Sequence, residues 1–187
     1  LAAARALCDR RGLALHLDGA RLFNAAVAQN VPARAIAQYF DSVSVCLSKG
    51  LGAPVGSVLL GERDLIEKAR RLRKMAGGGM RQAGILAAAG SYALDHNIAR
   101  LADDHTRAAR LAGGLRELPG LEVAGQHTNM VFIEVPASRL QALKAHMDAA
   151  RVRLSIGYTP GIRMVLHLDV DDDGVRRAVD AFRSFPP

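Results

Sequence analysis

Hydrophobic positions in the first hundred residues alternate between short apolar runs and helical spacing. Two of the runs contain β-branched valines, which favour strands, and glycine, aspartate or proline bounds them. Strands are expected over 13–17, 42–47 and 55–60, and helices over 1–11, 20–28 and 62–76, with a short turn or helix beginning at Pro32. This alternation of strand and helix predicts an α/β fold with a mostly parallel, covered sheet.

The pattern changes in the second half of the chain. Three glycines at 77–79 interrupt the helical pattern, which then continues to about residue 118. Pro119-Gly120 is the strongest turn signal in the sequence. Beyond it, strands are expected over 130–135, 152–156 and 162–168, and helices over 138–150 and 174–185. We therefore expect two domains, residues 1–105 and a small α+β domain over residues 106–187.

The composition is that of a folded protein. With 187 residues, 50% of them apolar and 23% charged, the chain can bury one or two cores, and intrinsic disorder is not expected. Cys8 and Cys46 are too few for a disulfide framework, which favours a reducing, cytoplasmic compartment. No apolar stretch reaches the roughly 20 residues that cross a bilayer, so no membrane partner is expected. The first residues predict a helix entered midway, not a signal peptide.

The formal net charge of +7 invites a nucleic-acid interpretation. The clearest basic run, at 70–74, lies within the expected helix over 62–76, whose apolar residues recur at helical spacing. These basic residues most simply form the solvated face of that helix, and no RNA-binding aromatic motif, zinc-knuckle spacing or helix-turn-helix pattern accompanies them. A nucleic-acid partner is therefore not expected, although an anionic small ligand could use part of the surplus charge.

No metal site is expected either. The histidines lack ligand spacing with a cysteine or a second histidine. The acidic run at 169–173 imitates the start of a calcium-binding loop, but a strand precedes it and its twelfth position is Asp180 instead of glutamate. It is expected to be the acid-rich start of a helix.

Two polar residues follow expected strands and could share one site. Asp18 ends the run over 13–17, and Lys49 follows the run over 42–47. Ligands of open α/β sheets bind at the carboxyl ends of the strands. Taken singly, Asp18 is more often a helix N-cap and Lys49 a solvated loop residue.

Together, the two residues fit pyridoxal phosphate chemistry. Lys49, among small and glycine neighbours, could form a Schiff base with the aldehyde of the cofactor, and Asp18 could hold its ring nitrogen. Arg163, at the start of a later strand, could bind a substrate carboxylate through two parallel hydrogen bonds. An ordinary exposed strand-end arginine remains the alternative for Arg163.

Four segments carry a family resemblance. They are 16–25 (HLDGARLFNA), 47–57 (LSKGLGAPVGS), 73–84 (RKMAGGGMRQAG) and 127–132 (HTNMVF). The first three are specific in combination. From about residue 1 to about residue 180, the chain resembles the low-specificity L-threonine aldolases, which are pyridoxal phosphate enzymes of the aspartate-aminotransferase-like fold. The resemblance implies the three-layer, mostly parallel sheet of a fold-type I enzyme for 1–105, with the small domain over 106–187.

The resemblance also implies roles for particular residues. Lys49 matches the lysine that holds the cofactor aldehyde, and Asp18 matches the carboxylate at the ring nitrogen. Arg21 and Arg163 match the arginines that bind the substrate carboxylate. Two further basic residues, Lys74 and Arg81, resemble family residues near the cofactor that could reach the site of a neighbouring subunit.

The implied reaction is pyridoxal phosphate-dependent cleavage of L-threonine and L-allo-threonine to glycine and acetaldehyde, in threonine catabolism and glycine biosynthesis. The implied enzyme is a homo-oligomer, a homotetramer built from dimers. Family members carry a segment ahead of the position of residue 1 that supplies the phosphate cradle and a ring-stacking histidine, so this chain is expected to hold only part of the large domain. Two alternatives stay open. One is another fold-type I lyase, such as a β-eliminating enzyme, and the other is a non-catalytic basic binding or assembly fragment.

Overall fold

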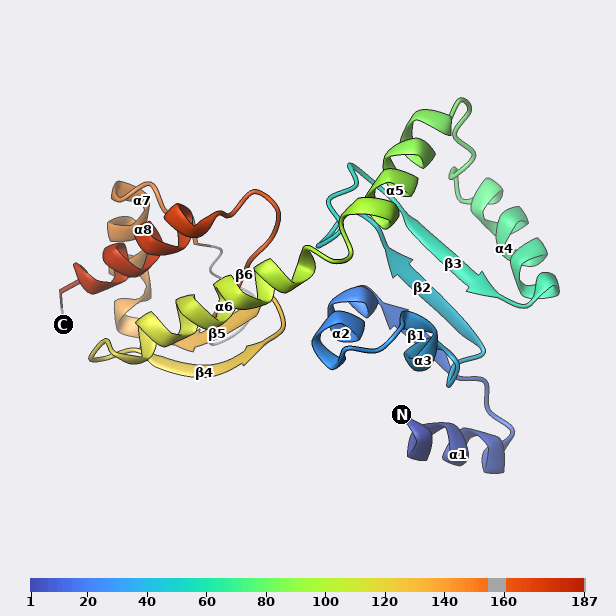
Figure 1. Cartoon of the computed structure of the whole chain (residues 1–187), viewed down its shortest axis with the longest axis horizontal. Coiled ribbons are helices and arrows are strands. Elements are labelled where there is room, and N and C mark those ends of the chain that lie inside the picture. Colours follow the sequence, from blue (N-terminus) through green and yellow to red (C-terminus); the bar gives the residue numbers. More distant parts are fainter. Residues whose placement is uncertain (155–160, 187) are drawn as a thin grey trace. The chain divides into compact units, whose positions relative to one another are not determined.

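The computed structural model describes residues 1–154 and 161–186 and divides into two units, Leu1–Arg100 and Leu101–Pro187 (Figure 1). The boundary expected from the sequence, after residue 105, lies inside a continuous helix, α6 (Leu101–Arg116). A short non-helical segment, 97–100, separates α6 from the preceding helix. The stronger turn signal at Pro119-Gly120 lies within the second unit, because it joins α6 to the sheet of that unit.

The first unit contains a three-stranded sheet with the order β1-β2-β3, formed by β1 (His16–Gly19), β2 (Ser42–Cys46) and β3 (Ser57–Gly61). β1 and β2 are parallel, and the helical segment between them provides the crossover that parallel neighbours need. β3 runs antiparallel to β2. The short loop between β2 and β3 contains no crossover helix, so the chain can only turn back.

Five helices accompany this sheet: α1 (Ala2–Arg11), α2 (Leu22–Gln29), α3 (Ala33–Ala37), α4 (Arg63–Met75) and α5 (Gly84–His96). The core of the unit forms where α2 and α3 meet β2, and it contains Leu22, Ala26, Ile36, Val43 and Val45. Pro32 is the N-cap of α3, with a φ of −65° that suits the start of a helix. The turn or helix expected at Pro32 is therefore a helix.

One carboxylate ties α1 to the rest of the first unit. Asp41 Oδ2 accepts hydrogen bonds from Leu15 N at 2.6 Å and from Arg5 Nη1 at 2.8 Å. The Leu15 amide and the Arg5 guanidinium hold the pKa of the Asp41 carboxyl below its ordinary value. The bond from Arg5 links α1, which has no buried residue, to Asp41.

Large apolar side chains remain exposed in the first unit, mainly on β3, α4 and α5. On α4 and α5, Leu72, Met75 and Ile85 are 61%, 81% and 81% exposed. α4 is the basic amphipathic helix expected from the sequence, and none of its residues is buried. Three of its apolar side chains, Leu65, Leu72 and Met75, therefore remain exposed in the described part of the chain.

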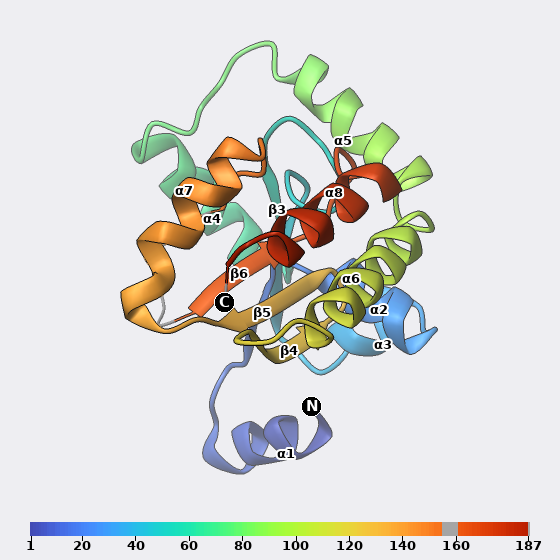
Figure 2. The ribbon, with the colours of Figure 1, turned by 90° about the vertical axis from the view of Figure 1, so that its left-hand side faces the viewer.

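The second unit is a three-stranded antiparallel sheet with helices on one side. β4 (Glu122–His127), β5 (Met130–Glu134) and β6 (Gly161–Val165) lie in the order β4-β5-β6, side by side in Figure 2. α6, α7 (Leu140–Ala149), α8 (Asp172–Arg183) and the 3-10 turn Ala137–Arg139 complete the unit. Its core joins the three helices to β5 and β6 and includes Leu115, Ile133, Leu143, Ile162 and Phe182.

The acidic run at 169–173 leads into α8. Asp171 is the N-cap of this helix, and its Oδ1 accepts a hydrogen bond from Gly174 N at 2.7 Å. Asp172 and Asp173 lie in the first turn, where the helix dipole favours negative charge. The expected acid-rich helix start is confirmed.

Three elements differ from the sequence-based expectation. β4 was not expected, because Gly125 weakens its strand pattern; the register of the β4–β5 pair shifts between Val123 and Gly125. The helical stretch to residue 118 is two helices, α5 and α6. Of the strand expected over 152–156, residues 152–154 are irregular, and 155–156 lie outside the described residues.

No helix in residues 1–154 and 161–186 is long and apolar enough to cross a membrane.

Candidate functional site

The parallel pairing of β1 and β2 brings their carboxyl ends to one edge of the sheet. Asp18 pairs with Ser44 and Gly19 pairs with Val45 in the ladder. Lys49 follows the last residue of β2, Cys46, by three positions. Asp18 and Lys49 therefore leave the sheet at the same edge.

Asp18 forms its own turn and does not cap a helix. Its Oδ1 accepts a hydrogen bond from Ala20 N at 3.2 Å. The N-cap of α2 is Arg21, which makes no side-chain capping bond. The helix-capping alternative for Asp18 is therefore wrong, and the exposed carboxylate has a second oxygen, Oδ2, available to a ligand.

Lys49 stands on a short loop that its own backbone stabilises. Gly52 N donates to Lys49 O at 2.9 Å, and Ala53 N donates to Leu47 O at 3.0 Å. Gly52 has a φ of +74°, a conformation that glycine adopts without strain. Lys49 itself is exposed, and its amine forms no hydrogen bond or ion pair within the described residues.

The loops after β1 and β2 meet around one small cavity. It is lined by residues 19–24, from the end of β1 to the start of α2, and by Cys46, Gly50 and Leu51 at and after the end of β2. Of the predicted site residues, Arg21 lines the cavity, whereas Asp18, in β1, and Lys49 are each next in sequence to a residue that lines it, Gly19 and Gly50. No described residue contributes to a metal-binding group of three or more His, Cys, Asp or Glu.

The net positive charge of the chain comes from the first unit. Residues 1–100 contain 14 basic and 7 acidic residues, whereas residues 101–187 contain 11 of each. A site on the first unit therefore lies in the part of the chain whose net charge attracts anions.

Lys74 and Arg81 flank the triple glycine between α4 and α5. A Cβ at Gly79 would lie 2.8 Å from Lys74 Nζ, so the lysine side chain lies against the glycine backbone. Arg81 is exposed. The predicted contribution of these two residues to a cofactor site stays a prediction.

Arg163 belongs to the second unit. It lies in β6 opposite Phe132 of β5 and is exposed, whereas the preceding Ile162 is 1% exposed and belongs to the core. Because side chains alternate along a strand, Arg163 is on the face of the sheet away from that core. Its role in substrate binding also stays a prediction.

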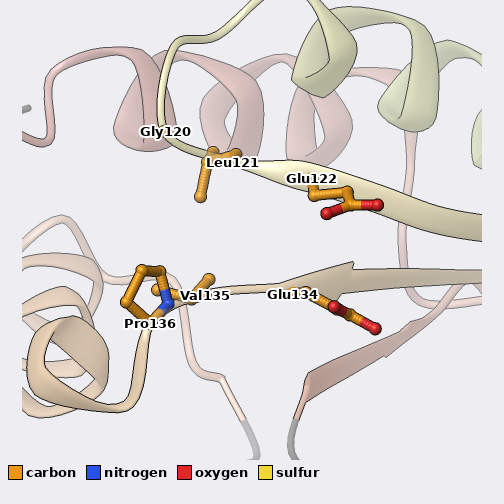
Figure 3. Close-up of a pocket in the computed structure, with 6 residues that line it drawn as sticks. All are labelled: Gly120, Leu121, Glu122, Glu134, Val135 and Pro136. Atoms are coloured by element: carbon orange, nitrogen blue, oxygen red, sulfur yellow. The ribbon is translucent and has the colours of Figure 1, made fainter.

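A larger cavity, of about 460 Å³, lies in the second unit and has different chemistry (Figure 3). Glu122 and Glu134 are paired across β4 and β5, and both line the cavity. Two carboxylates at facing positions repel an anionic ligand. This cavity therefore does not suit a phosphate or an amino-acid carboxylate.

One residue beside the loop that carries Lys49 was not expected from the sequence. Asn97 Nδ2 donates a hydrogen bond of 2.7 Å to Leu51 O, which lies 46 positions away. Its only signal in the sequence is a polar residue that directly follows an apolar helix, and many helix ends share that feature.

Solved structures with similar folds define the architecture. A putative L-allo-threonine aldolase from Listeria monocytogenes has a TM-score of 0.78 at 21% identity, covering 97% of this chain and 55% of that one. A threonine aldolase from Leishmania major has a TM-score of 0.78 at 23% identity, covering 96% and 54%. The predicted fold class, an α/β chain that covers part of the fold-type I architecture, is confirmed.

The sequence matches the beta-eliminating lyase family over residues 1–138, and the chain belongs to this family. It is 51% identical to the low specificity L-threonine aldolase of Escherichia coli over 175 residues, covering 94% of this chain and 52% of that protein. It is 44% identical to low-specificity L-threonine aldolase 1 of Arabidopsis thaliana, covering 95% and 51%. The resemblance inferred from the motifs is confirmed. The chain spans about half the length of the curated relatives it matches.

Replacing Gly19 with alanine should loosen the edge that carries Asp18. The added Cβ would lie 2.7 Å from Ser44 O, so β1 and β2 must separate, at a cost of about 1–3 kcal/mol in the free energy of unfolding. Urea denaturation and hydrogen exchange of the β1 and β2 amides measure this cost. Gly84→Ala is the control, since nothing lies within 4 Å of its added Cβ. Equal stability of the two variants would show that the close approach is unimportant.

Proposed function

We propose that the protein is a pyridoxal phosphate-dependent aldolase that cleaves L-threonine and L-allo-threonine to glycine and acetaldehyde. The observation that carries the proposal is the parallel pairing of β1 and β2, which brings Asp18 and the loop of Lys49 to one edge of the sheet. The names of the relatives support the substrate class.

The residues at this edge fit the cofactor. The Lys49 amine has no competing partner among the described residues, and the Asp18 carboxylate keeps Oδ2 for the ring nitrogen. The surplus of basic residues in the first unit suits an anionic phosphate. When bound, pyridoxal phosphate supplies an electron sink for a bond that breaks at the substrate α-carbon.

The side chains of this chain would divide the work as follows. Lys49 would hold the aldehyde end of the cofactor through its amine, and Asp18 would keep the proton on the ring nitrogen. Arg21 and Arg163 would bind the substrate carboxylate, which orients the bond between the α- and β-carbons for cleavage.

The oligomeric state and cellular role are proposals of the same kind. We propose a cytoplasmic homotetramer, built from dimers, that acts in threonine catabolism and glycine biosynthesis. The exposed apolar side chains of β3, α4 and α5 support association with another copy. In such an assembly Lys74 and Arg81 would lie near the cofactor and could reach the site of a neighbouring subunit.

The match to the beta-eliminating lyase family supports a second candidate, β-elimination at the same site. Product analysis separates the two reactions. An aldolase releases glycine from L-threonine, whereas a β-eliminating lyase releases a keto acid, which is pyruvate when serine is the substrate.

Borohydride reduction should trap the cofactor on Lys49. We expect the full protein, incubated with pyridoxal phosphate and reduced, to carry a pyridoxyl group on the peptide that contains Lys49, as measured by peptide mass mapping. Lys49→Ala should lose the adduct, and Lys68→Ala, which changes an exposed lysine of α4, should keep it. An adduct that survives Lys49→Ala would refute the assignment of the lysine.

Arg163→Ala should separate substrate binding from cofactor binding. The loss of a paired guanidinium is expected to raise the KM for L-threonine at least about tenfold, while the Kd for pyridoxal phosphate stays close to that of the wild type. Steady-state kinetics and a cofactor titration measure the two constants. Arg177→Ala, which removes an exposed arginine of α8, is the control. Equal weakening of substrate and cofactor binding would contradict the role of Arg163.

A further inference from the structure

The loop after Lys49 turns inward immediately beyond the lysine. Gly50 is buried, and Leu51 and Ala53 are 3% and 6% exposed, whereas Lys49 is exposed. The backbone bonds within the loop use the carbonyls of Lys49 and Leu47. The Leu51 carbonyl instead accepts a part-buried hydrogen bond of 2.7 Å from the side chain of Asn97.

The end of α5 holds Asn97 in place for this bond. Asn97 is the C-cap of α5, and its backbone N–H donates to Ala93 O at 2.9 Å. Ala93 is 2% exposed, so the residue that accepts this bond is packed in the core. The side chain of Asn97 therefore reaches the loop from a backbone position that the helix end defines.

α5 also packs closely against the start of the loop. Figure 1 shows α5 beside the connection between β2 and β3. A Cβ at Gly90 of α5 would lie 3.0 Å from Leu47 Cδ1, so the glycine permits the approach. A second, longer contact joins Arg100 Nη1 to Gly50 O at 3.5 Å. The helix and the loop thus pack against each other, and Asn97 makes the short hydrogen bond between them.

We propose that Asn97 is a positioning residue for Lys49. A carbonyl taken out of water needs a donor, and without Asn97 the loop must shift to hydrate the Leu51 carbonyl. Leu51 is two residues from Lys49, so such a shift moves the base of the lysine side chain. Asn97 fixes the direction of the amine without contacting it. This inference rests on the proposed function only in that Lys49 is the lysine that holds the cofactor.

Two variants test the hydrogen bond without any cofactor. Asn97→Ala removes the amide, and Asn97→Asp keeps its shape but replaces the donor nitrogen with an oxygen. Both should make the Gly52 and Ala53 amides exchange about tenfold faster than in the wild type, as measured by hydrogen exchange in the full protein. Asp95→Ala, an exposed change on the same helix, should leave the exchange unaltered. Wild-type exchange rates in both Asn97 variants would overturn the proposal.

A spectroscopic measurement tests whether the bond acts on Lys49. With pyridoxal phosphate added, the pH at which the visible absorption of the lysine adduct changes should shift in Asn97→Ala and Asn97→Asp. Trapping of the adduct at Lys49 should also become slower. Asp95→Ala should match the wild type in both measurements. An unshifted pH midpoint in both Asn97 variants would mean that Asn97 only stabilises the loop, and the positioning role would be wrong.

Failure of the proposed function gives a different result. If the wild type forms no adduct at Lys49, the cofactor assignment fails, whereas the exchange measurement still reports on the bond between Asn97 and Leu51. If the wild type forms the adduct and the Asn97 variants behave like it throughout, only the positioning inference fails.

Discussion

The candidate site depends on the parallel pairing of β1 with β2. Parallel strands bring their carboxyl ends to one edge, and here the register pairs Asp18 with Ser44. Gly19 permits this pairing, because any larger side chain would press against Ser44 O. An antiparallel arrangement would send Asp18 and Lys49 to opposite edges of the sheet, and no single ligand could use both.

The site is held by the core of the first unit, by the conformation of the loop after β2 and by a side-chain hydrogen bond from α5. The buried valines of β2 attach the edge to α2 and α3 in the core of the first unit. The glycines of the loop after β2 then allow a turn that exposes Lys49 while Gly50 and Leu51, which follow it, are buried. α5 reaches the same loop through the side chain of Asn97. The lysine is thus exposed but stands on a constrained backbone, which is the arrangement that an amine with a fixed target needs.

The sequence predicted the elements whose patterns are strong. The valines of β2, the spacing of apolar residues in α4 and the proline at the start of α3 each identified an element that the structure contains. β4 could not be predicted in this way, because Gly125 interrupts it and its stability comes from pairing with β5 across a shifted register. Long-range pairing of this kind leaves little trace in local composition.

The candidate site was predictable to a similar extent. Asp18 and Lys49 were found because each follows an apolar run over which a strand was expected, and their motifs are specific. Asn97 was not found, because a side-chain bond to a backbone carbonyl 46 positions away places no requirement on the neighbouring residues. Arg163 lies in another unit, and its part in a common site was expected from its residue type at the start of a strand and from the family resemblance.

The central claim is that Asp18 and Lys49 hold opposite ends of one pyridoxal phosphate ring. The most direct test is the nitrogen-15 chemical shift of the ring nitrogen when labelled cofactor is bound to the full protein and to its Asp18→Asn variant. A carboxylate beside the ring nitrogen favours its protonated form, and an amide does not. The account predicts a protonated nitrogen in the wild type and a neutral one in Asp18→Asn, with the Lys49 adduct present in both. The same chemical shift in the two proteins would contradict it.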